Sequence, residues 1–388
     1  MTTSVVAQSS LVDSAVAGRA LGDEIRLGLK GESPDAVILF ASTSHDYPLL
    51  LRELFDACRP SLLVGGSSAG EFTGGMVGQG AACAVALRAP EMQFHATIGR
   101  GLRADRVAAA RELSSGLRGL HGHDFGFRSA LVLTDAMAGH VEQLVEQLTM
   151  ETAGTYQFFG GGVGGDDRFQ GTCVFFGTEV VPDAVVALEI LSNKPIGVGV
   201  AHGWQPASAP MRVTESEGSR LVSMNAISAA DVYSEHAEAR GGGFDSKDPL
   251  PFFLHNIIGI STSEGHKLRV PLEVDSDGSI TCATEVSAGS LVHIMETSAA
   301  SASAAAETAV ASAIKNLGGH SPNVALFFDC VATRLRLGER FEEEVGAVKR
   351  ALGPTAFAGC NSIGQIARAE GQFSGFHNCT AVVCVIPD

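Results

Sequence analysis

Continuous apolar runs alternate with segments of helical periodicity along most of the chain. Residues 35–42 (DAVILFAS) form an apolar run of strand length, and the next segment has apolar residues at helical spacing, namely Leu49, Leu50, Leu54 and Cys58. Two further apolar stretches, LLVGGSSAGEF and then AACAVAL at 81–87, are typical of strands. The pattern therefore predicts a β-α-β-β unit in the first quarter of the chain.

The same order of elements occurs twice more. From Ser129 the chain has SALVLTDA, a helical segment, TYQFFGGGVGGDD and GTCVFFG, and from Asn323 it has NVALFFDCVATR, a helical segment, TAFAGCNSIGQIA and NCTAVVCVI. A glycine-containing turn follows the second strand of each copy. We predict an α/β fold in which repeated β-α-β-β units form mixed sheets flanked by helices, in two domains with partly duplicated halves.

The composition changes between the second and third copies. Residues 238–251 (EARGGGFDSKDPLP) are rich in Gly and Pro and have no apolar period, which favours a boundary between domains. Strand-like segments and an Ala-rich helical segment, SASAAAETAVASAIKNLG, follow it. We predict an N-terminal domain over 1–240, a linker over 241–251 and a C-terminal domain over 252–388.

The charge balance excludes some classes of partner. The 388 residues include 27 Lys and Arg and 43 Asp and Glu, a formal net charge of −16, and the basic residues are scattered, which disfavours nucleic-acid binding. No apolar run reaches the roughly 18 residues of a membrane span, and the first residues lack a basic segment followed by an apolar one. We therefore expect a cytoplasmic protein with no membrane partner.

The three glycine turns are candidates for a binding face. Loops at strand ends often hold ligands in α/β sheets, but glycine also serves tight turns and close backbone approach, and both interpretations stay open. Glu71 and Gln365 occupy matching positions, with Asp166 and Asp167 nearby in the second copy. Because one of the matching positions is an amide, acid/base catalysis is disfavoured. The turns match neither a phosphate loop nor a nucleophile elbow, so binding ranks above hydrolysis.

Other residues offer more specific chemistry. His202 and the single Trp, Trp204, lie in VGVAHGWQP, and the histidine is either a surface-loop residue, a ligand-facing group or an axial metal ligand. Cys330 and Arg334 follow the first strand of the third copy, and arginine at a strand end is suited to bind a carboxylate.

Several of these motifs together resemble the FIST proteins, which have an N-terminal and a C-terminal FIST domain. They are GGSSAGEF, FFGGGVGGDDRFQGTCVFF, GVGVAHGWQP, MRVTESEGSRLVSMNAISAADVY, FFDCVATRLRLG and AGCNSIGQI, and the resemblance extends from about Asp35 to Val385. It implies a sensory module that binds a small ligand in signal transduction. The resemblance also implies that a subset of the family are hemoproteins, which sense nitric oxide and inhibit a partner histidine kinase.

The resemblance also implies which residues form the site. Cys330 and Arg334 match a Cys-x-x-x-Arg segment of the family, and His202 with Trp204 matches a His-Gly-Trp segment, whereas Gln365 stands where the family usually has Glu. His202 is the candidate metal ligand. The ligand-binding candidates are Gly65, Gly66, Ser67, Ser68, Glu71, Gly161, Gly162, Trp204, Cys330, Arg334, Cys360, Asn361, Ser362 and Gln365.

Three hypotheses follow for a chain that carries no kinase or cyclase segment of its own. The first is a sensor with heme b on His202 that responds to nitric oxide and regulates a histidine kinase or diguanylate cyclase in trans. The second is a sensor of an amino acid or another carboxylate, bound by Arg334 and by turn N–H groups around Ser67 and Ser362. The third is an enzyme that uses heme, Cys330 or a serine; it ranks last because no base lies visibly beside a nucleophile.

Overall fold

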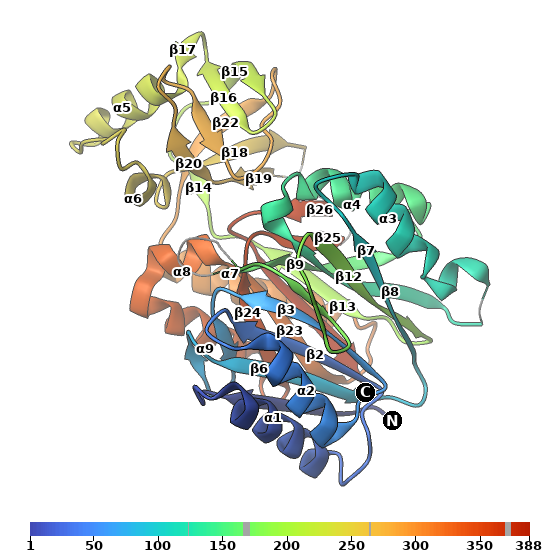
Figure 1. Ribbon diagram of the computed structural model, residues 1–388. Helices are drawn as coiled ribbons and strands as arrows, with labels where there is room; N and C mark the ends of the chain where they lie inside the picture. The colour runs from blue at the N-terminus through green and yellow to red at the C-terminus, as the bar shows by residue number, and fades with distance from the viewer. Residues whose placement is uncertain (123, 166–170, 264, 369–373) are drawn as a thin grey trace.

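Three β-α-β-β units surround a common core, and a smaller lobe projects from them (Figure 1). The computed structural model describes residues 1–122, 124–165, 171–263, 265–368 and 374–388. Asp166 and Asp167 lie outside these residues. Each unit contains two parallel strands that a helical segment connects, within a sheet that also has antiparallel strands. This arrangement confirms the predicted repetition and the mixed α/β fold.

In the first unit, two helices cover one face of a six-stranded sheet. The parallel strands β2 (Ala36–Ser42) and β3 (Leu62–Ser68) are joined through α2 (Tyr47–Cys58). The apolar side of α2 is buried on the sheet beside α1 (Ser14–Gly28). The sheet has the order β1-β6-β2-β3-β10-β11, and its other strands are β1 (Thr3–Ser9), β6 (Ala82–Arg88), β10 (Val174–Phe176) and β11 (Glu179–Val181).

The second unit repeats this plan. Its parallel strands β8 (Phe127–Asp135) and β9 (Gln157–Val163) are joined through α4 (Val141–Glu151), which packs on the sheet with α3 (Arg106–Ser115). The sheet has the order β26-β25-β9-β8-β12-β7, and its other strands are β26 (Ser374–His377), β25 (Gln365–Arg368), β12 (Ala184–Ser192) and β7 (Gln93–Arg100).

In the third unit, β23 (Pro322–Cys330) and β24 (Ala356–Ser362) are the parallel strands, and α8 (Val331–Leu337) and α9 (Phe341–Leu352) connect them. The Ala-rich segment forms α7 (Ala299–Lys315), which begins at a capping box and packs on the sheet beside α9. The sheet has the order β13-β27-β23-β24-β4-β5, and its other strands are β13 (Gly197–Ala201), β27 (Ala381–Pro387), β4 (Glu71–Thr73) and β5 (Val77–Gly78).

Each sheet is completed by a short hairpin from another unit. The β4–β5 hairpin leaves the first unit and pairs with β24 of the third, so that Glu71 lies opposite Cys360. The β10–β11 hairpin leaves the second unit for β3 of the first, and β25–β26 leaves the third unit for β9 of the second. This cyclic exchange interlocks the three units and brings residues from distant segments to one sheet edge.

The projecting lobe contains a fourth sheet, with strands from both sides of the predicted linker. Helices α5 (Ala229–Ala239) and α6 (Leu250–Phe253) pack on it, and Phe244 of the predicted linker lies 6.0 Å from Tyr233 between ring centroids. The predicted domain boundaries stay a prediction. The strands are β14 (Gln205–Pro206), β15 (Met211–Glu217), β16 (Arg220–Met224), β17 (Ile227–Ser228), β18 (Ile257–Thr262), β19 (Gly265–Arg269), β20 (Pro271–Val274), β21 (Ile280–Cys282) and β22 (Leu291–Glu296).

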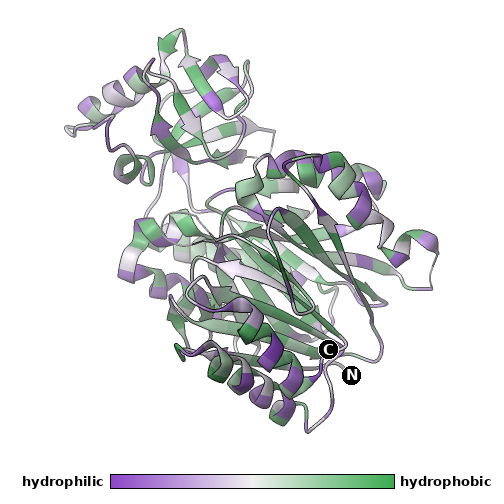
Figure 2. Ribbon diagram, viewed as in Figure 1, coloured by the Kyte–Doolittle hydropathy of each residue, from purple (hydrophilic) through white to green (hydrophobic). Residues whose placement is uncertain are grey.

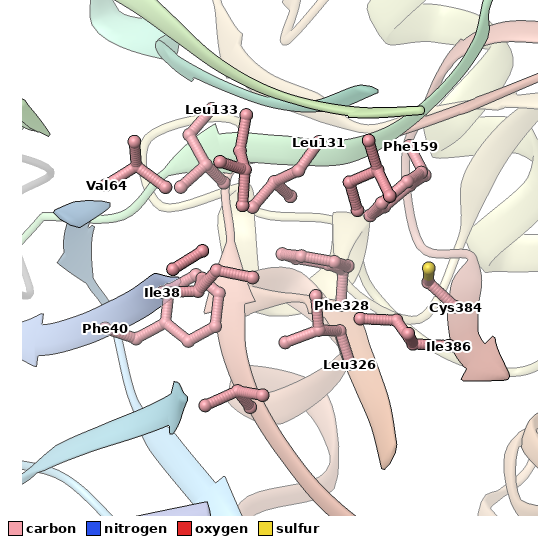
Figure 3. Close-up of a cluster of buried hydrophobic side chains, with 14 of the residues drawn as sticks. Ile38, Phe40, Val64, Leu131, Leu133, Phe159, Leu326, Phe328, Cys384 and Ile386 are labelled. Carbon is pink, nitrogen blue, oxygen red and sulfur yellow. The ribbon is translucent and has the colours of Figure 1, made fainter. Parts of the chain in front are cut away.

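The three main sheets share one apolar core. Figure 3 shows Phe40 of β2, Leu131 of β8, and Leu326 and Phe328 of β23 pointing toward one another from the three units. The rings of Phe40 and Phe328 meet edge to face, with centroids 5.7 Å apart. The strands carry mostly hydrophobic residues, whereas the outer surfaces of the covering helices are hydrophilic (Figure 2). Each sheet is thus buried on both faces, which explains its continuous apolar runs.

Candidate ligand-binding site

A pocket of about 620 Å³ lies between α8 and the hairpin that the first unit contributes to the third. Strand β5 and Gln79 form one side, and α8 with the residues after it forms the other. Arg334 on α8 and Asn361 on β24 both line it. The hairpin exchange creates this pocket, because Gln79 and Arg334 belong to different units.

Arg334 brings its guanidinium group to the pocket. When the side-chain amide of Gln79 is oriented with its oxygen toward this guanidinium group, the oxygen accepts hydrogen bonds from both Nη1 and Nη2 of Arg334. Two parallel N–H donors match the two oxygens of a carboxylate. Because Gln79 is exposed and its oxygen is a neutral acceptor, a carboxylate ligand can replace it with a charge-assisted pair that is roughly twice as strong.

Asn361 contributes an amide without a partner. The residue is 1% exposed, and neither Oδ1 nor Nδ2 has a hydrogen-bond partner within the described residues. Leaving such a group buried and unpaired costs roughly 1 to 3 kcal/mol. A Cβ added to Gly70 would lie 2.6 Å from Asn361 Oδ1 and 2.8 Å from Arg334 Nη1, so both polar groups converge on this glycine. They are therefore close enough to contact one small molecule.

Glu71 and Gln365 hold the exchanged hairpins in place. The buried Glu71 carboxylate accepts hydrogen bonds from Ser68 Oγ and, at 3.1 Å, from the Ala81 N–H. Burial raises the pKa of Glu71 to about 7, against the opposing effect of these hydrogen bonds and of Arg334. Gln365 makes the matching 3.0 Å contact with Ser362 Oγ. Both predicted residues therefore bond to residues that flank their hairpins and do not line the pocket.

The predicted glycine turns are wrong as turns, because their residues form the second halves of strands β3, β9 and β24, and these strand ends join the units to one another. The Ser67 N–H donates to the Cys173 carbonyl at 3.0 Å, the Gly162 N–H to Gly364 at 3.0 Å and the Asn361 N–H to Gly70 at 2.8 Å. Because these N–H groups have partners across the unit boundaries, Ser67 near the end of β3 offers its N–H to the protein rather than to a ligand. Six of the other predicted residues are also buried in this region: Gly65, Gly66, Ser68, Gly161, Cys360 and Ser362.

Of the predicted residues, the structure brings Arg334 and Asn361 together at the pocket. Trp204 and Cys330 lie outside it and line two other cavities. Gln79 was missed by the sequence analysis, because GQG after a short hairpin carries no signal of its own. Glu339 and Glu342, two exposed carboxylates that line the pocket, were also missed, since acidic residues at the start of a helix are common on surfaces.

Comparison with known families gives this arrangement a context. The FIST N domain matches residues 35–227, and the FIST C domain matches residues 229–368. The chain belongs to the FIST family. FIST domains are sensor domains of signal transduction that bind small ligands. The predicted family is therefore confirmed, and none of the described helices is long and apolar enough to cross a membrane.

Solved structures resemble the FIST chain only distantly. Cyanuric acid hydrolase from A. caulinodans is 8% identical, with a TM-score of 0.36 over 100% of this chain and 99% of that one. Phosphoribosylformylglycinamidine synthase II from Thermotoga maritima is 11% identical, with a TM-score of 0.24 over 99% of this chain and 72% of that one. Likenesses this weak carry no argument about function. No curated protein matches the chain.

The surroundings of His202 do not fit the heme that a subset of FIST proteins binds. His202 Nε2 donates to the His266 carbonyl at 3.1 Å, and Nδ1 accepts from the Trp204 N–H at 3.3 Å, which leaves neither nitrogen for iron. The adjoining cavity of about 10 Å³ has room for one water, not a porphyrin. In the part of the chain that the structure describes, no group of three or more His, Cys, Asp or Glu could hold a metal ion. Heme b and nitric oxide stay predictions of the family resemblance.

Two buried carboxyl groups line that same small cavity. Asp329 at the end of β23 and Glu344 on α9 are 1% and 2% exposed, and among the described residues Asp329 Oδ2 and Glu344 Oε2 have no hydrogen-bond partner. Burial raises the pKa of Glu344 to about 7, against the positive charge of Arg336, and burial with the nearby Glu344 raises that of Asp329 well above its usual range. Burial at this position therefore favours the protonated forms of both carboxyl groups.

The Glu344 pKa predicts how stability depends on pH. In the unfolded chain Glu344 ionises near its ordinary pKa of 4.5, and in the folded chain near 7, so its stabilisation is complete at low pH and is lost as pH rises through this window. We expect Glu344→Gln, which is neutral throughout, to become more stable relative to wild type by roughly 3 kcal/mol between pH 4.5 and pH 8. Urea midpoints of both proteins across this range measure the difference. If the difference in stability between the two proteins did not change with pH, Glu344 would have the same pKa in the folded and the unfolded chain.

Proposed function

We propose that this protein is a sensor of a small carboxylate-bearing molecule, that the molecule binds in the Arg334 pocket, and that binding regulates a separate signalling protein. The observation that carries the proposal is the buried amide of Asn361, which has no hydrogen-bond partner among the described residues, beside the donor fork of Arg334. A polar group left unpaired in a core is costly unless a ligand pairs with it. The free protein accepts this cost at a position open to a 620 Å³ pocket.

The charges around the pocket favour an amino acid over a simple organic acid. Arg334 supports the carboxylate, while Glu339 and Glu342, which also line the pocket, are exposed and take part in none of the described ion pairs. A dianion would meet repulsion from these two groups, whereas an ammonium group would be attracted to them. A zwitterion therefore complements both kinds of charge that line the pocket. The family resemblance supports a histidine kinase or diguanylate cyclase in trans as the regulated partner.

A thermal-shift panel of amino acids and organic acids tests this function. A ligand at 100 times its dissociation constant adds about 2.7 kcal/mol of stability, a shift that is easily measured. We expect amino acids to give larger shifts than matched dicarboxylates. Asn361→Leu, which removes the unpaired amide at similar volume, should melt higher than wild type without ligand and respond less to ligand. A panel without any shift, or an unchanged response in Asn361→Leu, would contradict the proposal.

A further inference from the structure

A second cavity lies between the projecting lobe and the three-unit body. It encloses about 260 Å³, and apolar side chains dominate its wall. The lobe contributes Leu254 and Leu272, and the body contributes Met137, Val331 and Ile363. Because a dry cavity of about 150 Å³ in another protein holds benzene, this one has room for roughly ten non-hydrogen atoms by the same proportion. The cavity is therefore large enough for a small organic molecule.

The wall of this cavity selects for a neutral molecule. The described residues that line it carry no charge, whereas the Arg334 pocket has its arginine and two glutamates. Burying an unpaired charge against such a wall is far more costly than burying apolar surface. Met137 is 45% exposed and Ala283 is also exposed, and since both line the cavity, it opens to solvent beside apolar side chains. A neutral and mainly apolar molecule can therefore enter.

One amide side chain faces the cavity from this apolar wall. Asn378, which follows β26, is 3% exposed, and its Oδ1 accepts a hydrogen bond from Thr284 Oγ1 at 3.1 Å. Its Nδ2 group has no hydrogen-bond partner among the described residues and keeps a little exposed surface, which faces the cavity because the residue lines it. An amide donor left unpaired in this way costs free energy that an acceptor on a ligand recovers. The cavity thus offers one hydrogen-bond donor to its occupant.

We propose that this cavity binds a neutral, mainly apolar ketone of about ten non-hydrogen atoms, whose carbonyl oxygen accepts a hydrogen bond from Asn378 Nδ2. The apolar part of the molecule lies against the leucines of the lobe and the apolar residues of α8. Because lobe and body both contact the molecule, its binding stabilises the contact between them, which ion pairs of Arg269 and Lys267 with Glu142 also hold. The site is separate from the Arg334 pocket and does not rest on the function proposed for that pocket.

Titrations of the full chain, followed by NMR of ¹³C-labelled methionine methyl groups, test the proposal. The probes are acetophenone, which has one carbonyl oxygen, and α-methylstyrene, in which a CH₂ group replaces that oxygen at nearly the same shape. We expect both probes to shift the signal of Met137, which Met137→Leu identifies by its loss, and the titrations give both dissociation constants. If neither probe moved this signal up to its solubility limit, the cavity would not be a binding site and the proposal would be overturned.

Asn378→Leu separates the hydrogen bond from the apolar contacts. The variant removes the donor at similar volume, so it should weaken acetophenone about fivefold relative to α-methylstyrene. An equal change for both probes would contradict the contact with the amide. The infrared carbonyl stretch of bound, ¹³C-labelled acetophenone tests the same contact in the wild-type protein. One hydrogen bond places it below its frequency in cyclohexane, and a frequency equal to that in cyclohexane would also contradict the contact.

Substitutions at exposed alanines of the lobe locate the site. Ala283→Trp places an indole at the cavity and should weaken both probes about tenfold, because a close-packed wall leaves no other space for it. Ala288→Trp is the matched control, since Ala288 is exposed in the same lobe but does not line the cavity, and it should leave both dissociation constants unchanged. Arg334→Gln should leave them unchanged too, which keeps this test independent of the carboxylate site. Undiminished binding in Ala283→Trp would place the probes elsewhere and overturn the proposal. Urea midpoints confirm that each variant is folded.

Discussion

Arg334→Gln is expected to weaken binding of the best carboxylate ligand by about 30- to 100-fold, equivalent to 2 to 3 kcal/mol. Hydrogen bonds to a charged group contribute about 1.5 to 3 kcal/mol, and the variant loses both the positive charge and the two-pronged geometry. Arg334→Lys keeps the charge without the fork and should recover only part of the affinity. Isothermal titration calorimetry on folded protein gives the dissociation constants.

Arg340→Gln is the matched control for this prediction. Arg340 lies after α8 near the pocket but does not line it, and it is exposed and paired with Glu343 on the surface at 2.9 Å. The substitution changes the net charge by the same amount and removes a pair worth no more than about 1 kcal/mol. An equal loss of affinity in both variants would mean that Arg334 acts only through the overall charge of the protein. Unchanged affinity in Arg334→Gln would place the ligand elsewhere.

The sequence predicted the repeated units because each rests on local patterns. The apolar run at β2, the helical spacing in α2 and the recurrence of both after Ser129 are visible without tertiary information. The hairpin exchange was not predictable in this way. Strands as short as Glu71–Thr73 contain no signal for which sheet they join, since their partner is fixed by tertiary packing rather than by local propensity.

The candidate site was predictable only in part for the same reason. Arg334 and Asn361 stand out because each follows or ends a strand of a recognisable unit, where polar side chains often meet. Their common neighbour Gln79 depends on the exchanged hairpin and could not be found. His202 stood beside the only tryptophan, but the hydrogen bonds that occupy its ring nitrogens come from His266 and Trp204 and appear only in the folded chain.

One glycine in each of the strands β3, β9 and β24 leads to the prediction with the largest effect on stability. A Cβ added to Gly65 would lie 2.0 Å from the Leu39 carbonyl oxygen, one added to Gly160 would lie 2.1 Å from that of Val132, and one added to Gly359 would lie 2.1 Å from that of Phe327. In each unit the contact is with the neighbouring parallel strand. The three strands thus need glycine for the same close approach of backbone to backbone, which explains the repetition of these glycines without a ligand.

We expect Gly65→Ala and Gly359→Ala each to destabilise the protein by about 4 kcal/mol or more, or to prevent folding, because a rigid carbonyl cannot move aside without breaking the ladder. Gly243→Ala is the control: its added Cβ meets nothing within 4 Å, so the change should stay within about 0.5 kcal/mol. Urea midpoints and yields of folded protein measure the three variants. If Gly65→Ala unfolded at the same urea concentration as Gly243→Ala, strands β2 and β3 would have to be able to move apart at Gly65. The close approach of the strands would then not require glycine, and ligand binding would again become the simplest reason for these residues.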